Sequence, residues 1–150
     1  MLDWQWRRFP ELTVDELYRV VALRQQVFIV EQKSIYQDAD GYDRGSHHLL
    51  GGLPGEPEPF LAAYLRVLPP GLKYPEASFG RVITAPRVRS QGYGKTLVEK
   101  GLSFIETHFP GAPVRIGAQH YLQRFYEGYG FRPISDVYDE DGVPHIDMIR

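Results

Sequence analysis

The stretch from residue 79 to residue 105 sets a short glycine-bearing loop between a strand pattern and a helix pattern. Phe79 to Thr84 is an apolar run rich in β-branched residues, which predicts a strand. After the loop at 89–96, apolar residues recur at helical spacing as far as Ile105. Glycines let the backbone approach an anion, and the N–H groups and dipole of a helix start favour negative charge there. The segment therefore predicts a phosphate-binding loop.

Spacing separates the common kinds of phosphate-binding loop. A Walker A loop ending at Lys95 would need a glycine where this chain has Arg89. The dinucleotide fingerprint needs three glycines, and only Gly92 and Gly94 have counterparts here. The pattern that fits is Arg-x-x-Gly-x-Gly, with Arg89, Gly92 and Gly94 in place. It resembles the pyrophosphate loop of the GNAT acetyltransferases, and the resemblance implies that the loop holds the diphosphate of acetyl-CoA.

Composition favours one ordinary intracellular domain spanning residues 1–150. Of the 150 residues 43% are hydrophobic and 24% are charged, which is typical of a globular protein with its own core. The formal net charge of −2 does not favour a nucleic-acid partner. No apolar run approaches the ~20 residues of a membrane-spanning helix. The absence of cysteine suits a reducing compartment. We expect a soluble cytoplasmic protein that binds neither nucleic acid nor membranes.

The order of elements predicts an α/β domain with a central mixed β-sheet flanked by helices. Residues 1–9 read as a first strand, and the capping box of Thr13 and Glu16 begins a helix from about 14 to 28. Residues 31–46 read as a long loop with room for a short helix. Further strands are expected near 47–52, 60–68, 78–84, 114–117, 131–138 and 143–149, and further helices over 92–108 and near 120–128. Asp141-Gly142 predicts a hairpin between the last two strands.

A second motif follows the loop by about 30 residues. Phe125-Tyr126 and Gly130-Phe131 form Phe-Tyr-x-x-x-Gly-Phe, which resembles the second acetyl-CoA motif of the GNAT family. Taken alone, Tyr126 reads as a half-buried packing residue with a polar tip. The resemblance implies instead that it protonates the departing CoA thiolate. Where the family commonly has an asparagine near the cofactor, this chain has Gln119, an amide with a different reach.

The resemblance extends over nearly the whole chain and narrows to the ElaA-type branch of the GNAT family. The residues that carry it are Phe28 to Gln32, Tyr36 to Gly41 and Glu140 to Ile146. It implies the GNAT fold, with acetyl-CoA as cosubstrate. The expected diphosphate-binding residues are Arg89, Ser90, Gln91, Gly92, Tyr93, Gly94, Lys95 and Thr96. The edge of the strand at Val82, Ile83 and Thr84 is expected to pair with the pantetheine amides and to supply an oxyanion donor.

The residues leave the general base open. Glu31 follows the first helix, and His145 lies on the last expected strand; His47 and His48 open an earlier strand. Histidine is the natural base near neutral pH. The same positions can equally hold hydrogen-bonded or surface residues with no catalytic role.

The carboxylates of the loop also permit two interpretations. Asp38, Asp40 and Asp43, together with Glu31, can attract a cationic acceptor or simply cap turns. We expect no metal site. An EF-hand aligned on Gly41 would place His47 at a ligand position that requires a carboxylate. His47 and His48 are adjacent on a strand, so their side chains point to opposite faces.

These observations predict an N-acetyltransferase. Acetyl-CoA would donate to an amine of a small molecule or peptide, by direct attack in a ternary complex because no cysteine can carry the acetyl group. The protein would act as a monomer or a homodimer. The alternative is a non-catalytic acyl-CoA sensor or interaction domain of the same fold. A nucleotidase with a phosphate loop is disfavoured by Arg89.

Overall fold

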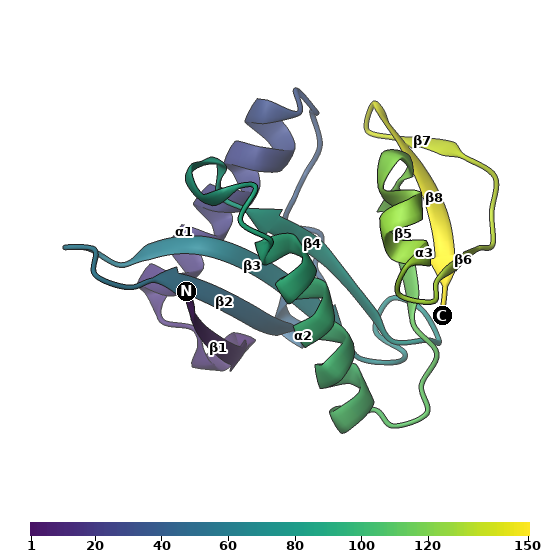
Figure 1. Cartoon of the computed structure of the whole chain (residues 1–150), viewed down its shortest axis with the longest axis horizontal. Helices are drawn as coiled ribbons and strands as arrows, with labels where there is room; N and C mark the ends of the chain where they lie inside the picture. The colour runs from purple at the N-terminus through teal and green to yellow at the C-terminus, as the bar shows by residue number, and fades with distance from the viewer.

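The computed structural model, which describes residues 1–150, contains two antiparallel sheets that adjoin at the start of β4 (Ser78–Thr84) and β5 (Arg115–Gln119). The first sheet has the strand order β1-β2-β3-β4, and in the second β8 pairs with β5, β6 and β7. The other strands are β1 (Asp3–Arg8), β2 (His47–Leu53), β3 (Phe60–Leu68), β6 (Arg132–Pro133), β7 (Tyr138–Glu140) and β8 (Val143–Ile149). The α/β fold class is confirmed (Figure 1).

The two sheets join at a single parallel bridge between Ala77 and Val114, where the N-terminal ends of β4 and β5 meet. Ala77 accepts a hydrogen bond from Arg115 N at 2.8 Å and donates one to Pro113 O at 3.0 Å. Beyond this bridge no pairing continues between β4 and β5, so the parallel part of the expected mixed sheet is limited to it. The two strands are therefore free to diverge toward their C-terminal ends.

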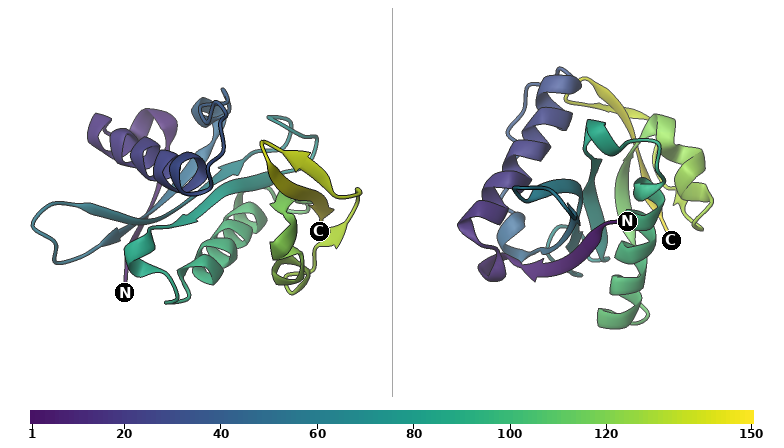
Figure 2. Two further views of the ribbon diagram at one scale, coloured as in Figure 1. Left: turned by 90° about the horizontal axis from the view of Figure 1, so that it is seen from above. Right: turned by 60° about the vertical axis from the view of Figure 1, so that its left-hand side comes forward.

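The helices α1 (Val14–Arg24) and α2 (Tyr93–His108) cover opposite faces of the first sheet (Figure 2). The predicted capping box starts α1: Thr13 Oγ1 accepts from Glu16 N at 3.0 Å, and Glu16 Oε1 accepts from Thr13 N at 2.9 Å. Along α2, the apolar face foreseen from the spacing is buried. A Cβ on Gly101 would lie 3.2 Å from Leu65, so this glycine permits the close approach of α2 to β3.

The first helix differs from its prediction. The α-helical part ends at Arg24, and Gln25–Glu31 continue as a π-helix. Gln32 N bonds to Val27 O and Ser34 N to Ile29 O, each across five residues. Apolar spacing does not distinguish the wider π turn from an α turn, and such segments are common at functional sites.

No helix in this fold combines the length and the apolar character that a membrane-spanning segment needs.

The C-terminal part also departs from simple strands and helices. The helix expected near 120–128 begins as a 3-10 turn at His120–Leu122 and continues as α3 (Gln123–Glu127). The single strand expected over 131–138 is wrong. The chain instead forms β6 and β7, separated by a segment in which the Ser135 hydroxyl accepts from Asp147 N. The predicted hairpin is confirmed, with both turn residues in the left-handed region, as a tight two-residue turn requires.

Candidate active site

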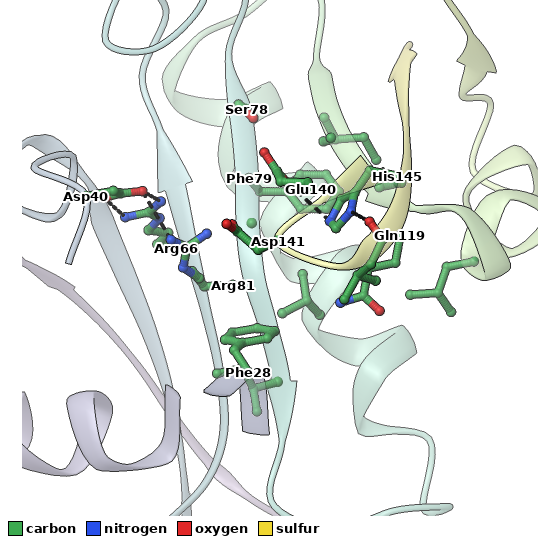
Figure 3. A pocket seen from close by; sticks show the side chains of 18 of the residues that line it. Phe28, Asp40, Arg66, Ser78, Phe79, Arg81, Gln119, Glu140, Asp141 and His145 are labelled. Atoms are coloured by element: carbon green, nitrogen blue, oxygen red, sulfur yellow. Dashed lines mark hydrogen bonds and ion pairs between the residues drawn. The ribbon is translucent and has the colours of Figure 1, made fainter. Parts of the chain in front are cut away.

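A cavity of about 600 Å³ opens where β4 and β5 diverge. Its walls come from both sheets, from the loop that follows the π-helix, from α3 and from the β7–β8 hairpin. Figure 3 shows His145 and Glu140 on one side and Arg66 and Arg81 on the other, with Asp141 between them in this view. A volume of this size is within the range of small-molecule binding sites, ~300–1,000 Å³. The cavity is therefore the candidate active site.

A bulge in β4 shapes one wall of the cavity. The register with β3 shifts between Tyr64 and Arg66, and Arg81 opposite this shift has φ +52°, a left-handed value for a non-glycine residue. Ala85 N donates to Ala62 O at 2.8 Å. Because hydrogen-bonding direction alternates along an antiparallel strand, the backbone groups of Thr84 and Val82 face away from β3. Ile83 directs its backbone to β3, so Val82 and Thr84 offer the free edge to a ligand.

The glycine loop forms an N–H-rich end of the same site. Gly92 has φ +82° and precedes α2, and the first backbone bond of the helix runs from Thr96 N to Gly92 O at 3.3 Å. The N–H groups of residues 91–95 donate to no acceptor within the protein. Gly94 lines the cavity, and a Cβ there would meet no atom within 4 Å. The loop predicted from spacing thus presents several free donors at the start of a 16-residue helix.

Arg89 and Glu31 form an ion pair beside this loop. Arg89 Nη2 donates to Glu31 Oε1 at 2.6 Å, and Arg89 Nε lies 3.4 Å from Thr84 O. Glu31 ends the π-helix and does not line the cavity. The structure therefore places this candidate base next to the N–H-rich loop rather than in the cavity.

Tyr126 lines the cavity and is only 6% exposed. Its ring packs edge-on against Phe131, with the ring centres 5.9 Å apart. Its hydroxyl makes no hydrogen bond within the protein. Burial raises the pKa of Tyr126 well above the ordinary value of a phenol. The hydroxyl thus stays protonated and is available as a hydrogen-bond donor.

His145 lies on β8 directly opposite Gln119 on β5, and both line the cavity. His145 Nδ1 donates to Val143 O at 2.8 Å, so the lone pair of the neutral ring is on Nε2. Nε2 lies 3.3 Å from a carboxylate oxygen of Glu140. Gln119 Nε2 is 3.4 Å from Gln32 Oε1 and so connects the second sheet to the end of the π-helix.

The other two candidate histidines, His47 and His48, do not line the cavity. His48 is buried between the Tyr64 hydroxyl, at 2.6 Å, and the Asp43 carbonyl oxygen, at 2.9 Å. His47 packs against Phe104 on the far side of β2. Burial lowers the pKa of both rings below the ordinary value. As their adjacency predicted, the two side chains do not converge.

The loop aspartates take a role that neither sequence interpretation included. They form ion pairs with three arginines that are buried or nearly so. Arg24 binds Asp38 at 2.7 Å and Asp43 at 2.6 Å. Arg66 binds Asp40 at 2.5 Å and Asp43 at 2.8 Å, and Arg81 binds Asp38 at 2.8 Å. We call these six residues the ion-pair cluster: Arg24, Asp38, Asp40, Asp43, Arg66 and Arg81.

Arg66 and Arg81 bring the ion-pair cluster to the cavity wall, and no sequence motif pointed to either of them. Arg66 interrupts the apolar run of β3 and is only 2% exposed. A charged residue in a buried strand requires partners, so this position was the available signal. Burial opposes ionisation of Asp40 and Asp43, but the hydrogen bonds and charges of Arg66 and Arg24 hold the pKa of both carboxyls below the ordinary value.

The chain resembles known acyltransferases over its full length. It matches the family model described as "Acetyltransferase (GNAT) domain" over residues 72–150. Protein ElaA of Escherichia coli is 41% identical over 152 residues, which cover 100% of this chain and 97% of ElaA.

Solved structures agree with these sequence matches. The crystal structure of Escherichia coli ElaA has a TM-score of 0.90 and covers 100% of this chain and 99% of its own. The crystal structure of an acyl-CoA N-acyltransferase from Pseudomonas aeruginosa is 41% identical, with a TM-score of 0.93 and the same coverage. A Bacillus subtilis acetyltransferase crystallised with CoA shares the fold at 18% identity and a TM-score of 0.64, over 99% of this chain and 95% of its own.

Proposed function

Because the chain belongs to the GNAT family of acetyltransferases, we propose that it moves an acetyl group from acetyl-CoA to an amine of a small molecule or peptide. The family and its structural neighbours make the chain an acyltransferase. The observation that carries the proposal is the cavity between β4 and β5, because it joins the N–H-rich loop to Tyr126 and His145.

The residues at one end of the cavity fit acetyl-CoA. The free N–H groups of residues 91–95 would bind the diphosphate, with charge added by Arg89 and Lys95. The open space over Gly94 leaves room for the backbone approach that this binding needs. The free edge of β4 at Val82 and Thr84 would hydrogen-bond the pantetheine amides, as an added strand would. Acetyl-CoA, when bound, supplies the activated acetyl group.

The remaining chemistry belongs to side chains of the cavity. We assign His145 as the general base that takes the proton from the amine, because it lines the cavity and because Glu140, 3.3 Å from Nε2, would stabilise the imidazolium that forms. The Tyr126 hydroxyl would donate a proton to the leaving thiolate. A backbone N–H on the free edge of β4 would stabilise negative charge on the thioester oxygen. Without cysteine, direct attack in a ternary complex is the favoured route.

Glu31 is the second candidate base. Its ion pair with Arg89 and its position outside the cavity favour a role beside the diphosphate. His145 is therefore the base that this arrangement supports best.

Calorimetry with acetyl-CoA, followed by a CoA-release assay over a panel of amines, tests the proposal. We expect saturable binding and CoA release with at least one amine. Absence of binding at millimolar acetyl-CoA would refute the cofactor assignment. Binding without CoA release across the panel would favour the non-catalytic acyl-CoA sensor.

A further inference from the structure

The cavity has an end that acetyl-CoA does not account for. β4 runs from Ser78 to Thr84, and Thr84 lies next to Arg89, which adjoins the glycine loop proposed to bind the diphosphate. Ser78 is at the opposite end, where Tyr42, Lys73 and Tyr74 complete the lining. If the proposed acetyl transfer is correct, this end receives the amine acceptor.

Lys73 is the cation of this end that has no carboxylate partner. Arg66 and Arg81, the arginines of the cavity wall, are ion-paired within the ion-pair cluster. Lys73 forms no ion pair within 4.0 Å. Its Nζ lies 5.4 Å from the ring centre of Tyr74 and 5.7 Å from that of Tyr42. Lys73 lies in an exposed part of the lining. Partial desolvation and the charge of Arg66 lower the pKa of its ammonium, whereas the carboxylates of Glu140 and Asp40 act in the opposite direction, as an anionic ligand also would.

The opposite wall carries acidic groups. Glu140 and Asp141 lie on the β7–β8 hairpin and line the cavity, as Figure 3 shows. Asp141 forms no ion pair, the one ion pair of Glu140 is with His145, and the Glu140 carboxylate also acts on the charge of Lys73. An approaching ammonium group is therefore attracted to the hairpin side, while an anion is attracted to Lys73. The acceptor end therefore carries charges of both signs.

We propose that Lys73 binds a carboxylate of the acceptor, so that the amine acetylated by this protein carries a carboxylate, as in amino acids and ω-amino acids. One ammonium matches the single charge of a carboxylate and donates charge-assisted hydrogen bonds to it. The tyrosine rings on either side would pack against the carbon chain of the acceptor. The hairpin side would receive its amine, next to His145.

Matched amines test this inference directly. CoA release is measured for ω-amino acids of increasing chain length and for the alkylamines that lack only the carboxylate, such as 4-aminobutyrate and propylamine. At the chain length that spans the cavity, we expect kcat/KM to be about tenfold or more higher for the carboxylated member. Equal or better use of the alkylamine at every length would overturn the inference and leave acetyl transfer intact.

Variants of Lys73 separate recognition from a structural role. The selectivity measured here is kcat/KM for the carboxylated amine divided by kcat/KM for the matched alkylamine. Lys73→Met should reduce this selectivity to about one, and Lys73→Arg should restore most of it. Lys100→Met is the matched control. Lys100 also lies over an aromatic ring, 5.5 Å from Trp4, and it is outside the cavity. A Lys73→Met variant that loses activity equally toward both amines would contradict carboxylate recognition.

A binding measurement distinguishes failure of the proposed acetyl transfer from failure of the proposed carboxylate site. If no amine releases CoA, the same ω-amino acids are titrated by calorimetry into the protein saturated with acetyl-CoA. Binding that is lost in Lys73→Met and kept in Lys100→Met would support the carboxylate site without transfer. No binding of any ω-amino acid would overturn it.

Discussion

Arg81 donates from Nε to Asp38 Oδ1 at 2.8 Å while its own backbone is held at φ +52°. For a residue with a Cβ, this left-handed conformation costs ~1–2 kcal/mol. The ion pair therefore ties the β4 bulge to the loop that follows the π-helix. Since the bulge lies in the strand that lines the cavity, the ion-pair cluster is part of what shapes the site.

Substitution of Arg81 should separate the ion pair from the backbone strain. We expect Arg81→Ala to lower the free energy of unfolding by about 3 kcal/mol, because Asp38 loses a partner in a mostly buried cluster. Arg81→Gly also loses the ion pair but relieves the strain, so it should be about 1 kcal/mol more stable than Arg81→Ala. Urea denaturation measures both values. An alanine variant at least as stable as the glycine variant would argue against a strained bulge.

Acid should destabilise the protein through the same cluster. The pKa values of Asp40 and Asp43 lie below the ordinary 3.8 in the folded chain. The unfolded chain therefore takes up protons first, and the free energy of unfolding falls as pH drops below about 4. In Asp40→Asn this fall should be shallower, as measured by urea denaturation between pH 3 and 7. Asp136→Asn is the control, because Asp136 is exposed and forms no ion pair. Identical slopes for all three proteins would rule out this source of acid sensitivity.

The local parts of the fold could be predicted because their signals are local. The helix face of α2 follows from apolar spacing, the start of α1 from its capping box, and the β7–β8 hairpin from Asp141-Gly142. The strand–glycine loop–helix arrangement at 79–105 was also predictable, since its three parts are contiguous in the sequence. The resemblance to the GNAT family added the positions of Tyr126 and Gln119, which line the cavity.

The rest depended on contacts between distant residues. The pairing of Arg66 with Asp40 spans 26 residues, and that of Arg81 with Asp38 spans 43. No periodicity encodes such pairs. The π-helix was missed because seven residues are too few to show a different period. The sequence could not select a candidate general base among Glu31, His145, His47 and His48. Only the structure shows which of these side chains lines the cavity between β4 and β5.

Gly94→Ala should separate cofactor binding from folding. A Cβ at this position meets no protein atom, and alanine is the better helix former, so the free energy of unfolding should rise by up to ~1 kcal/mol. Acetyl-CoA affinity should fall about tenfold or more, because the methyl group occupies the space proposed for the diphosphate. Calorimetry measures the affinity, and S-acetyl-pantetheine, which lacks the diphosphate, is the control ligand whose binding should not change. Unchanged acetyl-CoA affinity would place the diphosphate elsewhere.

Glu31→Gln decides between the two roles considered for Glu31. The substitution keeps the shape of the side chain and removes the charge that Arg89 now binds. We expect the Kd for acetyl-CoA to fall about twofold to fivefold, since Arg89 is released to bind the diphosphate, with kcat retained. Steady-state kinetics and calorimetry provide the two values. A loss of kcat of about 10²-fold or more would identify Glu31 as the general base instead of His145.

Tyr126→Phe tests the proposed acid. Phenylalanine keeps the packing against Phe131 and removes only a hydroxyl that has no partner within the protein. We expect kcat to fall about 10²-fold while the Kd for acetyl-CoA stays nearly constant. Because burial raises the pKa of Tyr126, the hydroxyl remains protonated at alkaline pH, and the rate ratio of wild type to variant should be constant from pH 7 to 9.

The control for this prediction is Tyr129→Phe, in the same segment. Tyr129 does not line the cavity, and its hydroxyl bonds to Glu99 at the surface, at 3.1 Å. Its removal should leave both kcat and the Kd unchanged. If Tyr126→Phe retains full kcat, the leaving thiolate is protonated by another group or by water, and Tyr126 serves only to pack the wall of the cavity.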